Sequence, residues 1–228
     1  MDEIVVTLSS EDEIGTEEST ATTICGDLIG ENWVKGETIF AYLSLKIPES
    51  LTIDPIVFQN DIKTHGIRGS RTDFGDGFVV IPIHHHDHWF LSIMDAATGI
   101  VAVMDTLRKT LATEVIDKLE EIGMALYDNL PLHEFRKPEG ISVAPMKTES
   151  YVVQFDTVSC GPLICMLAEA IHVNGPLFFN IAEVREWREE ASKLLTEQIA
   201  AVTSYQIVPG ALTKKRAPRK NRRGRKKF

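Results

Sequence analysis

Residues 151–171, YVVQFDTVSCGPLICMLAEAI, combine a short β-branched run, a polar turn and an apolar segment of helical character. Cys160 and Gly161 stand where the turn gives way to the predicted helix. The unpaired N–H groups and the positive dipole end of a helix N-terminus favour an anion such as a thiolate. Cys160 is therefore either a nucleophile or a small buried side chain, as most free cysteines are. The choice depends on whether the chain supplies a base.

The composition is that of a globular chain with one core. The 228 residues are 43% hydrophobic, which is enough for a single well-filled domain. Three cysteines without a CxxC pair indicate free thiols and a reducing compartment. No apolar run approaches the ~18 residues of a membrane span, and the acidic N-terminus is unlike a signal peptide. We therefore expect a soluble intracellular protein that has no membrane partner.

Charge is distributed unevenly along the chain, whose net charge is −9. Residues 214–228 hold ten of the 24 Lys and Arg residues and no acid, whereas residues 1–23 are acidic and rich in Ser and Thr. Both ends are predicted to be flexible, on either side of a globular domain over residues 24–213. The basic tail has the composition of a nuclear-import signal, so we expect a nuclear protein. Non-specific, salt-dependent contact of this tail with nucleic acid is a second interpretation.

The hydrophobic periodicity predicts an α+β domain with a mixed or antiparallel central sheet flanked by helices. Residues 61–77 are polar and Gly-rich, and are predicted to form a surface loop. Helices are predicted over 36–46, 106–130, 160–173 and 181–205, and strands over 56–58, 78–83, 89–94, 100–104, 141–143 and 151–154.

Four histidines between two predicted strands supply the candidate base. His84, His86 and His88 alternate along the chain and could share one face of a metal site. No Cys or acidic pattern elsewhere completes such a site, so we expect no metal and no cofactor, and assign residues 84–86 to a solvated turn. His88 differs because it begins a core strand. Asp105 ends the next strand, so an antiparallel hairpin would place its carboxylate beside His88 and let it orient the imidazole.

Residues 33–171 resemble the ubiquitin-like-specific (SUMO/sentrin-specific) cysteine proteases. That family has a His-Trp strand start, an Asp-Ser-Leu-like segment seventeen residues later and a Gln-x-Asn-x-x-Asp-Cys-Gly block. The matching features here are His88-Trp89, Met104-Asp105-Thr106-Leu107 and, six residues after Gln154, Cys160-Gly161.

The resemblance implies a papain-like fold with a catalytic cysteine at a helix N-terminus. By this resemblance Cys160 is the nucleophile, His88 the general base and Asp105 the residue that orients the base. Gln154 would supply the side-chain donor of an oxyanion hole, together with the backbone N–H of Cys160. The expected activity is that of a cysteine-type peptidase.

Two tryptophans are candidates for substrate binding, because the family holds a Gly-Gly tail between two such rings. Trp89 matches one of them directly, and Trp33 stands where the family has Trp-Leu-Asn-Asp. Core packing is the alternative for each ring. The expected partners are a ubiquitin-like modifier, SUMO or a relative, and its conjugates.

The sequence departs from the family pattern next to the nucleophile. Ser159 replaces the usual Asp before the cysteine, and Asp156 replaces the Asn. The three residues of the expected triad are intact, so catalysis is expected, in either precursor maturation or deconjugation. Two alternatives stay open: a viral- or transposon-type processing protease, and a catalytically silent module that binds a ubiquitin-like protein.

Overall fold

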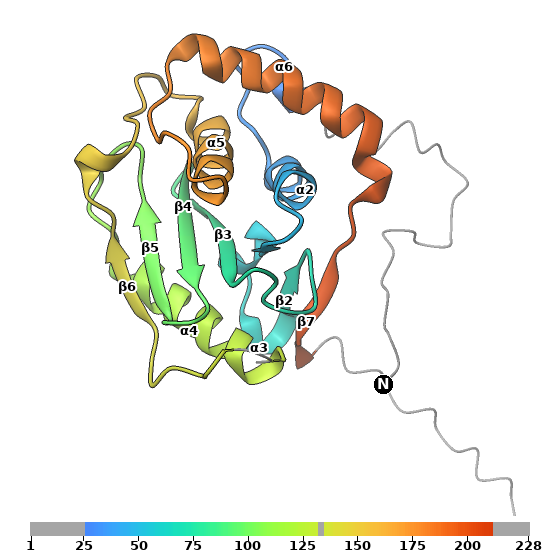
Figure 1. Cartoon of the computed structure of the whole chain (residues 1–228), viewed down its shortest axis with the longest axis vertical. Helices are drawn as coiled ribbons and strands as arrows, with labels where there is room; N and C mark the ends of the chain where they lie inside the picture. The colour runs from blue at the N-terminus through green and yellow to red at the C-terminus, as the bar shows by residue number, and fades with distance from the viewer. Residues whose placement is uncertain (1–25, 132–134, 212–228) are drawn as a thin grey trace, which may run out of the picture.

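The computed structural model describes residues 26–131 and 135–211, so the predicted tails 1–23 and 214–228 lie outside the described residues. Figure 1 shows helices packed around a central sheet. None of the helices in the described ranges is both long and apolar enough to cross a membrane. The α-helices are α2 (Gly36–Lys46), α3 (Ile62–His65), α4 (Thr113–Asn129), α5 (Cys160–His172) and α6 (Ile181–Gln198). The 3-10 helices are η1 (Gly26–Leu28), η2 (Pro55–Phe58), η3 (Thr148–Ser150) and η4 (Ile199–Ala201).

The central sheet is mixed, as the sequence predicts for the fold class. Its strand order is β1-β3-β4-β5-β6, with antiparallel pairing in the middle and parallel pairing at both edges. A second, two-stranded sheet pairs β2 with β7. The strands are β1 (Leu51–Thr52), β2 (Gly66–Gly69), β3 (Phe78–His85), β4 (His88–Asp95), β5 (Ile100–Met104), β6 (Ser142–Pro145) and β7 (Tyr205–Pro209).

Both faces of the central sheet are buried, which explains the nearly continuous apolar runs of its strands. On β4, Trp89, Leu91 and Ile93 pack into one core with α2, α5 and α6. Phe90 and Met94, which alternate with them, pack into the other core with α4. The packing of these two cores therefore fixes the position of β4 from both faces of the sheet.

A tight turn joins β3 to β4. His86 and Asp87 both have left-handed backbone angles, with φ of 47° and 53°, and His85 pairs with His88 across the hairpin. Two consecutive left-handed residues form the type of turn whose twist suits a hairpin. β3 thus includes His84 and His85, and β4 begins at His88, so the solvated turn predicted for residues 84–86 is wrong for the first two residues. Because the chain reverses at His86 and Asp87, the histidines also do not alternate along one extended strand.

Several predicted elements are also wrong in type or extent. Residues 56–58 form the 3-10 helix η2 instead of a strand, because the Asp54 side chain caps the Ile56 N–H and Pro55 opens the turn. The predicted loop 61–77 contains α3 and β2. The predicted helix 181–205 ends at Gln198, and Tyr205 begins a strand that pairs with β2.

Two further corrections lie beside the candidate site. The predicted helix 106–130 begins only at Thr113, since the Asp105 carboxylate accepts hydrogen bonds from the N–H groups of Leu107 and Lys109 and holds the chain in a turn. Residues 151–154 form no strand, because their backbone bonds go to two different loops. The Val152 N–H donates to the Leu177 carbonyl, and the Gln154 N–H donates to the Thr106 carbonyl.

Candidate active site

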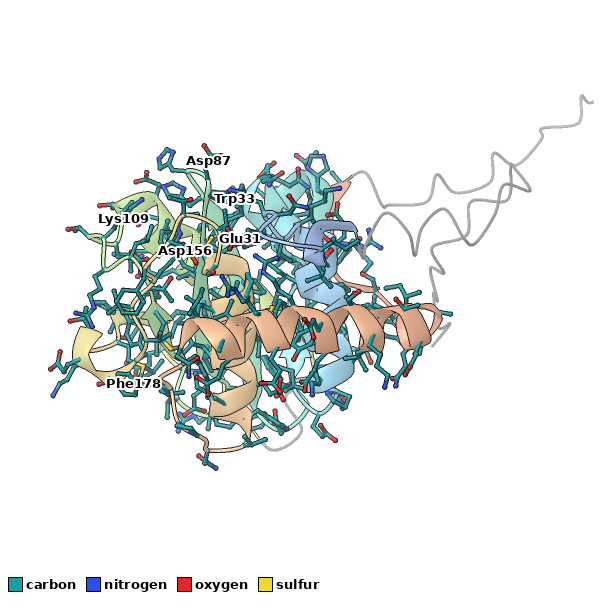
Figure 2. All side chains as sticks on the ribbon, turned by 90° about the horizontal axis from the view of Figure 1, so that it is seen from above. Glu31, Trp33, Asp87, Lys109, Asp156 and Phe178 are labelled. Carbon is teal, nitrogen blue, oxygen red and sulfur yellow. The ribbon has the colours of Figure 1, made fainter. Side chains whose placement is uncertain are left out.

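Cys160 is the first residue of α5 and directly follows the 156–159 turn, whose Asp156 is labelled in Figure 2. The Asp156 side chain organises this turn: its Oδ1 accepts from the N–H groups of Val158 and Ser159, at 2.9 and 2.8 Å. Its Oδ2 accepts from the Ser159 hydroxyl at 2.6 Å. The two residues that depart from the family pattern therefore bond to each other and position the start of the helix.

The close approach of α5 to its neighbours requires Gly161. A Cβ at this position would lie 2.9 Å from the Val34 Cβ and 3.6 Å from the Trp89 Cδ1. The first distance is shorter than van der Waals contact allows, so a side chain here would push the helix away. The glycine thus brings Cys160 up to β4, which begins at His88.

His88 and Asp105 form a buried hydrogen-bonded pair. The His88 Nε2 lies 2.7 Å from the Asp105 Oδ1, and the two residues are 2% and 7% exposed. Burial would raise the pKa of Asp105, but the bonds from His88 and from the two backbone N–H groups outweigh it and lower that pKa. The carboxylate is therefore ionised near neutral pH and fixes one ring nitrogen.

The Cys160 thiol is the second partner of the His88 imidazole. Burial alone would lower the pKa of His88, but hydrogen bonds with Asp105 and Cys160 raise it above its ordinary value. A raised pKa favours the imidazolium, which is the form that stabilises a neighbouring thiolate. The structure thus brings together three of the residues singled out in the sequence, in the arrangement nucleophile, base and orienting carboxylate.

Gln154 lies beside the same turn with its amide orientation fixed. Its Oε1 accepts from the Thr106 hydroxyl at 3.1 Å, and its Nε2 donates to the Asp156 carbonyl at 2.8 Å. The N–H end of the amide therefore faces the turn before Cys160. The same Nε2 also donates to the Asp156 Oδ1 at 3.4 Å, a longer and weaker contact than the bond to the carbonyl.

The two candidate substrate-binding tryptophans differ in exposure. Trp33 is 42% exposed, whereas Trp89 is 4% exposed and its Nε1 donates to the Val34 carbonyl at 3.0 Å. This bond ties the segment that carries Trp33 to the start of β4. Figure 2 places Trp33 and Asp156 near the same edge of the molecule, far from Phe178. Trp33 is thus the more accessible of the two rings.

Arg188 is a candidate functional residue that the sequence interpretation missed. It is only 5% exposed, and its Nη2 donates to the carbonyls of Asn32 and Val158 at 2.9 and 3.3 Å. Burial lowers the pKa of Arg188, while attraction from Asp156 and other acidic groups, and from Cys160, opposes that change. The guanidinium therefore adds a buried positive charge within electrostatic reach of the thiol.

The periodicity of α6 contained a signal for this arginine. Val184, Trp187, Ala191 and Leu195 form the buried stripe of the helix, and residue 188 falls on the same stripe. A charged side chain on an apolar stripe requires partners in the interior. Here those partners are the carbonyl of Asn32, next to Trp33, and the carbonyl of Val158, in the turn before Cys160.

Comparisons with known proteins identify the fold. No protein-family model matches the sequence, and neither does any curated protein. Among solved structures, the SUMO protease Ulp1 with its catalytic cysteine oxidized to a sulfonic acid has a TM-score of 0.62 at 16% identity, covering 78% of this chain and 84% of that one.

Two further structures agree with this match. The C-terminal Ulp1 protease domain in complex with SMT3, the yeast ortholog of SUMO, has a TM-score of 0.59 at 15% identity, covering 78% of this chain and 83% of that one. The catalytic domain of the Ulp1-like SUMO protease from Chaetomium thermophilum has a TM-score of 0.50 at 13% identity, covering 86% and 92%. The chain therefore has the fold of the Ulp1-like SUMO proteases, as the resemblance of residues 33–171 predicts.

Proposed function

We propose that the protein is a cysteine peptidase that cleaves after the C-terminal Gly-Gly of a ubiquitin-like modifier such as SUMO. The observation that carries this proposal is the buried His88, whose Nε2 lies 2.7 Å from the Asp105 Oδ1 and whose imidazole also interacts with the Cys160 thiol at the start of α5. A thiol, an imidazole and a carboxylate in this order activate a nucleophile for acyl transfer.

In the first half of the reaction, the Cys160 thiol gives its proton to His88 and the thiolate attacks the carbonyl carbon of the terminal glycine. The C–N bond of the tetrahedral intermediate then breaks. His88 gives its proton to the departing amine, and a thioester between Cys160 and the modifier remains. Asp105 stays ionised and stabilises the imidazolium throughout.

In the second half, a water molecule attacks the thioester carbonyl and His88 accepts its proton. The C–S bond breaks, which releases the carboxylate of the modifier and returns the thiolate. The negative oxygen formed in each half requires preorganised donors. The Gln154 amide and the backbone N–H of Cys160 are suited to this task, because both lie at the turn that begins α5. The Gln154 Nε2 would exchange its long 3.4 Å contact with the Asp156 Oδ1 for a bond to this oxygen.

The choice of substrate is supported by the neighbouring structures and by Trp33. Those neighbours are described as SUMO proteases, and one of them is in complex with SMT3. Glycines are the residues that fit a narrow passage beside a large ring, and the accessible face of Trp33 provides such a wall. The leaving amine can belong to a peptide bond or to an isopeptide bond, so the proposal includes maturation and deconjugation.

The test uses ubiquitin-like modifiers that carry a C-terminal electrophile in place of the scissile bond. Each modifier is incubated with the wild type, with Cys160→Ala and with Cys165→Ala, which removes a second thiol of the same helix. We expect a covalent adduct with at least one modifier in the wild type and in Cys165→Ala, and none in Cys160→Ala. Affinity without an adduct would favour a silent binding module, and neither adduct nor affinity would favour a processing protease for another substrate.

We also propose that residues 214–228 direct the protein to the nucleus, because ten basic side chains lie in this segment. A fluorescent fusion of the full chain should accumulate in the nucleus. Replacement of the ten Lys and Arg by Gln should abolish this accumulation. Equal nuclear enrichment of both fusions would refute the proposal.

A further inference from the structure

Three candidate metal ligands lie at the tip of the β3–β4 hairpin, where it meets the first turn of α4. They are His85, His86 and Glu114, and their ligand atoms all lie within 4.8 Å of one another. We propose that these three side chains bind a divalent transition-metal ion, with zinc as the best match. This inference is independent of the peptidase proposal.

A second observation comes from the His85 ring. Its Nε2 atom is sealed from solvent, yet it has no hydrogen-bond partner in the part of the chain that the structure describes. The Glu114 Oε1 lies 3.5 Å away, at ion-pair distance but without a hydrogen bond. A buried ring nitrogen without a partner is unfavourable, whereas a metal ion would accept its lone pair.

The donor set suits zinc. Two imidazole nitrogens and one carboxylate oxygen are a common set of three protein ligands for Zn²⁺, with a fourth position left for water or another ligand. Bonds of about 2.0–2.2 Å require the three atoms to come closer together than they lie now. His86 and Glu114 are exposed and can rotate toward the ion, while His85 is held at the end of β3.

The turn itself keeps the two imidazoles together. The rings of His85 and His86 have centroids 3.9 Å apart, and His86 is the first of the two left-handed turn residues. Asp87, the second, projects at the outer edge of the molecule in Figure 2. Adjacent residues of a strand normally point to opposite faces, so it is the turn after His85 that allows both rings to lie on one side.

A metal ion here would fasten the hairpin to α4. His85 pairs directly with His88 across the two strands, so one ligand of the ion would be the strand partner of the candidate base. The expected effect is greater rigidity of the start of β4. Sequence patterns could not supply the acidic ligand, because Glu114 belongs to a helix that begins well after the hairpin.

The thiol of Cys160 and the ring of His88 are a competing site for a soft metal ion. We would therefore titrate the full-length chain with Co²⁺, as a spectroscopic substitute for Zn²⁺, in the wild type and in Cys160→Ala. The variants His86→Asn and Glu114→Gln are then compared in the Cys160→Ala background. Asn is chosen at position 86 because it tolerates a left-handed backbone. Glu120→Gln, which changes an exposed acid of the same helix, is the control.

The expected result is binding of one Co²⁺ per chain in Cys160→Ala, seen as d–d absorption bands that Zn²⁺ abolishes by displacement. His86→Asn and Glu114→Gln should each weaken binding by at least about tenfold, and Glu120→Gln should leave it unchanged. Absence of saturable bands in Cys160→Ala would overturn the proposal. Equal binding by all three variants would overturn it too, since the ion would then lie elsewhere.

Discussion

Two cysteines of α5, five residues apart, show how differently one helix can treat the same side chain. Cys160 and Cys165 are both buried, at 1% and 0% exposure. Burial, followed by the nearby Glu169, raises the pKa of Cys165 well above its ordinary value, so this thiol stays protonated. Cys160 instead contacts the imidazole of His88.

Burial therefore does not decide which thiol can react. Both thiols belong to the same apolar core, but Cys160 lies on the first turn of α5, beside His88, whereas Cys165 lies further along the helix. Cys160 interacts with His88 of β4 and with the buried Arg188 of α6, and Asp105, the residue after β5, in turn holds His88. Each of these parts can be altered separately to test the comparison.

The largest effect is expected when each thiol is replaced by alanine in a separate variant and the activities of the two variants are compared. Cys160→Ala should lower kcat/KM on a modifier substrate by about 10,000-fold or more, because the nucleophile is lost. Cys165→Ala should keep its activity but lose about 1 kcal/mol of unfolding free energy, since a buried side chain is truncated. Steady-state kinetics and urea denaturation measure the two effects. Equal activity losses in the two variants would refute the distinction.

The next effect concerns the carboxylate that orients the base. Asp105→Asn preserves shape but removes the charge that holds His88, so kcat/KM should fall about 100- to 10,000-fold. The exposed Asp117→Asn is the matched control and should be neutral. If Asp105→Asn were as active as this control, the pair with His88 would serve the fold alone.

A smaller effect is expected from the buried arginine. Arg188→Lys keeps the charge but loses the fork that reaches two carbonyls, so Cys160 should shift and kcat/KM fall about 10- to 100-fold. The rate at which iodoacetamide alkylates Cys160 should fall in parallel, whereas Cys165 should stay unreactive in both proteins. An unchanged alkylation rate would mean that Arg188 stabilises the fold without positioning the thiol.

The smallest effect is a dependence of stability on pH. The pKa of Asp105 is lowered in the folded protein, so its ionised form contributes stability above the unfolded-state value of about 4. This contribution is lost as the pH falls through the folded-state pKa. Denaturation at several acidic pH values should show a steeper loss for the wild type than for Asp105→Asn. Parallel curves would contradict the lowered pKa.

The sequence predicted the elements that bring the base and its carboxylate together, because strands 89–94 and 100–104 carry strong apolar patterns and a short turn between them. That hairpin fixes where Asp105 falls relative to His88 without any knowledge of the rest of the fold. The helix that begins at Cys160 was predictable for a similar local reason. These are the parts in which local pattern and tertiary contacts agree.

The parts that failed depend on contacts between distant segments. Residues 151–154 have the composition of a strand, but their hydrogen-bond partners are the loops at Thr106 and Leu177. Residues 205–209 form a strand only because β2 lies beside them. Likewise, the partners of Arg188 come from the segment around Asn32 and the turn before Cys160, and no pattern within α6 encodes them.

The close packing at Gly161 shows that the two residues of the Cys-Gly pair are constrained for different reasons, one by packing and the other by chemistry. The glycine is required by Val34, whose Cβ would lie 2.9 Å from any added Cβ, and this requirement exists whether or not the protein reacts with a substrate. Under the proposed function, the thiol of Cys160 is required for chemistry. Cys160 is itself buried, so a relative that had lost the activity could replace it only by another small side chain, and it would still have to retain glycine at residue 161. Among such relatives the glycine would mark the shared architecture, and the thiol alone would mark the activity.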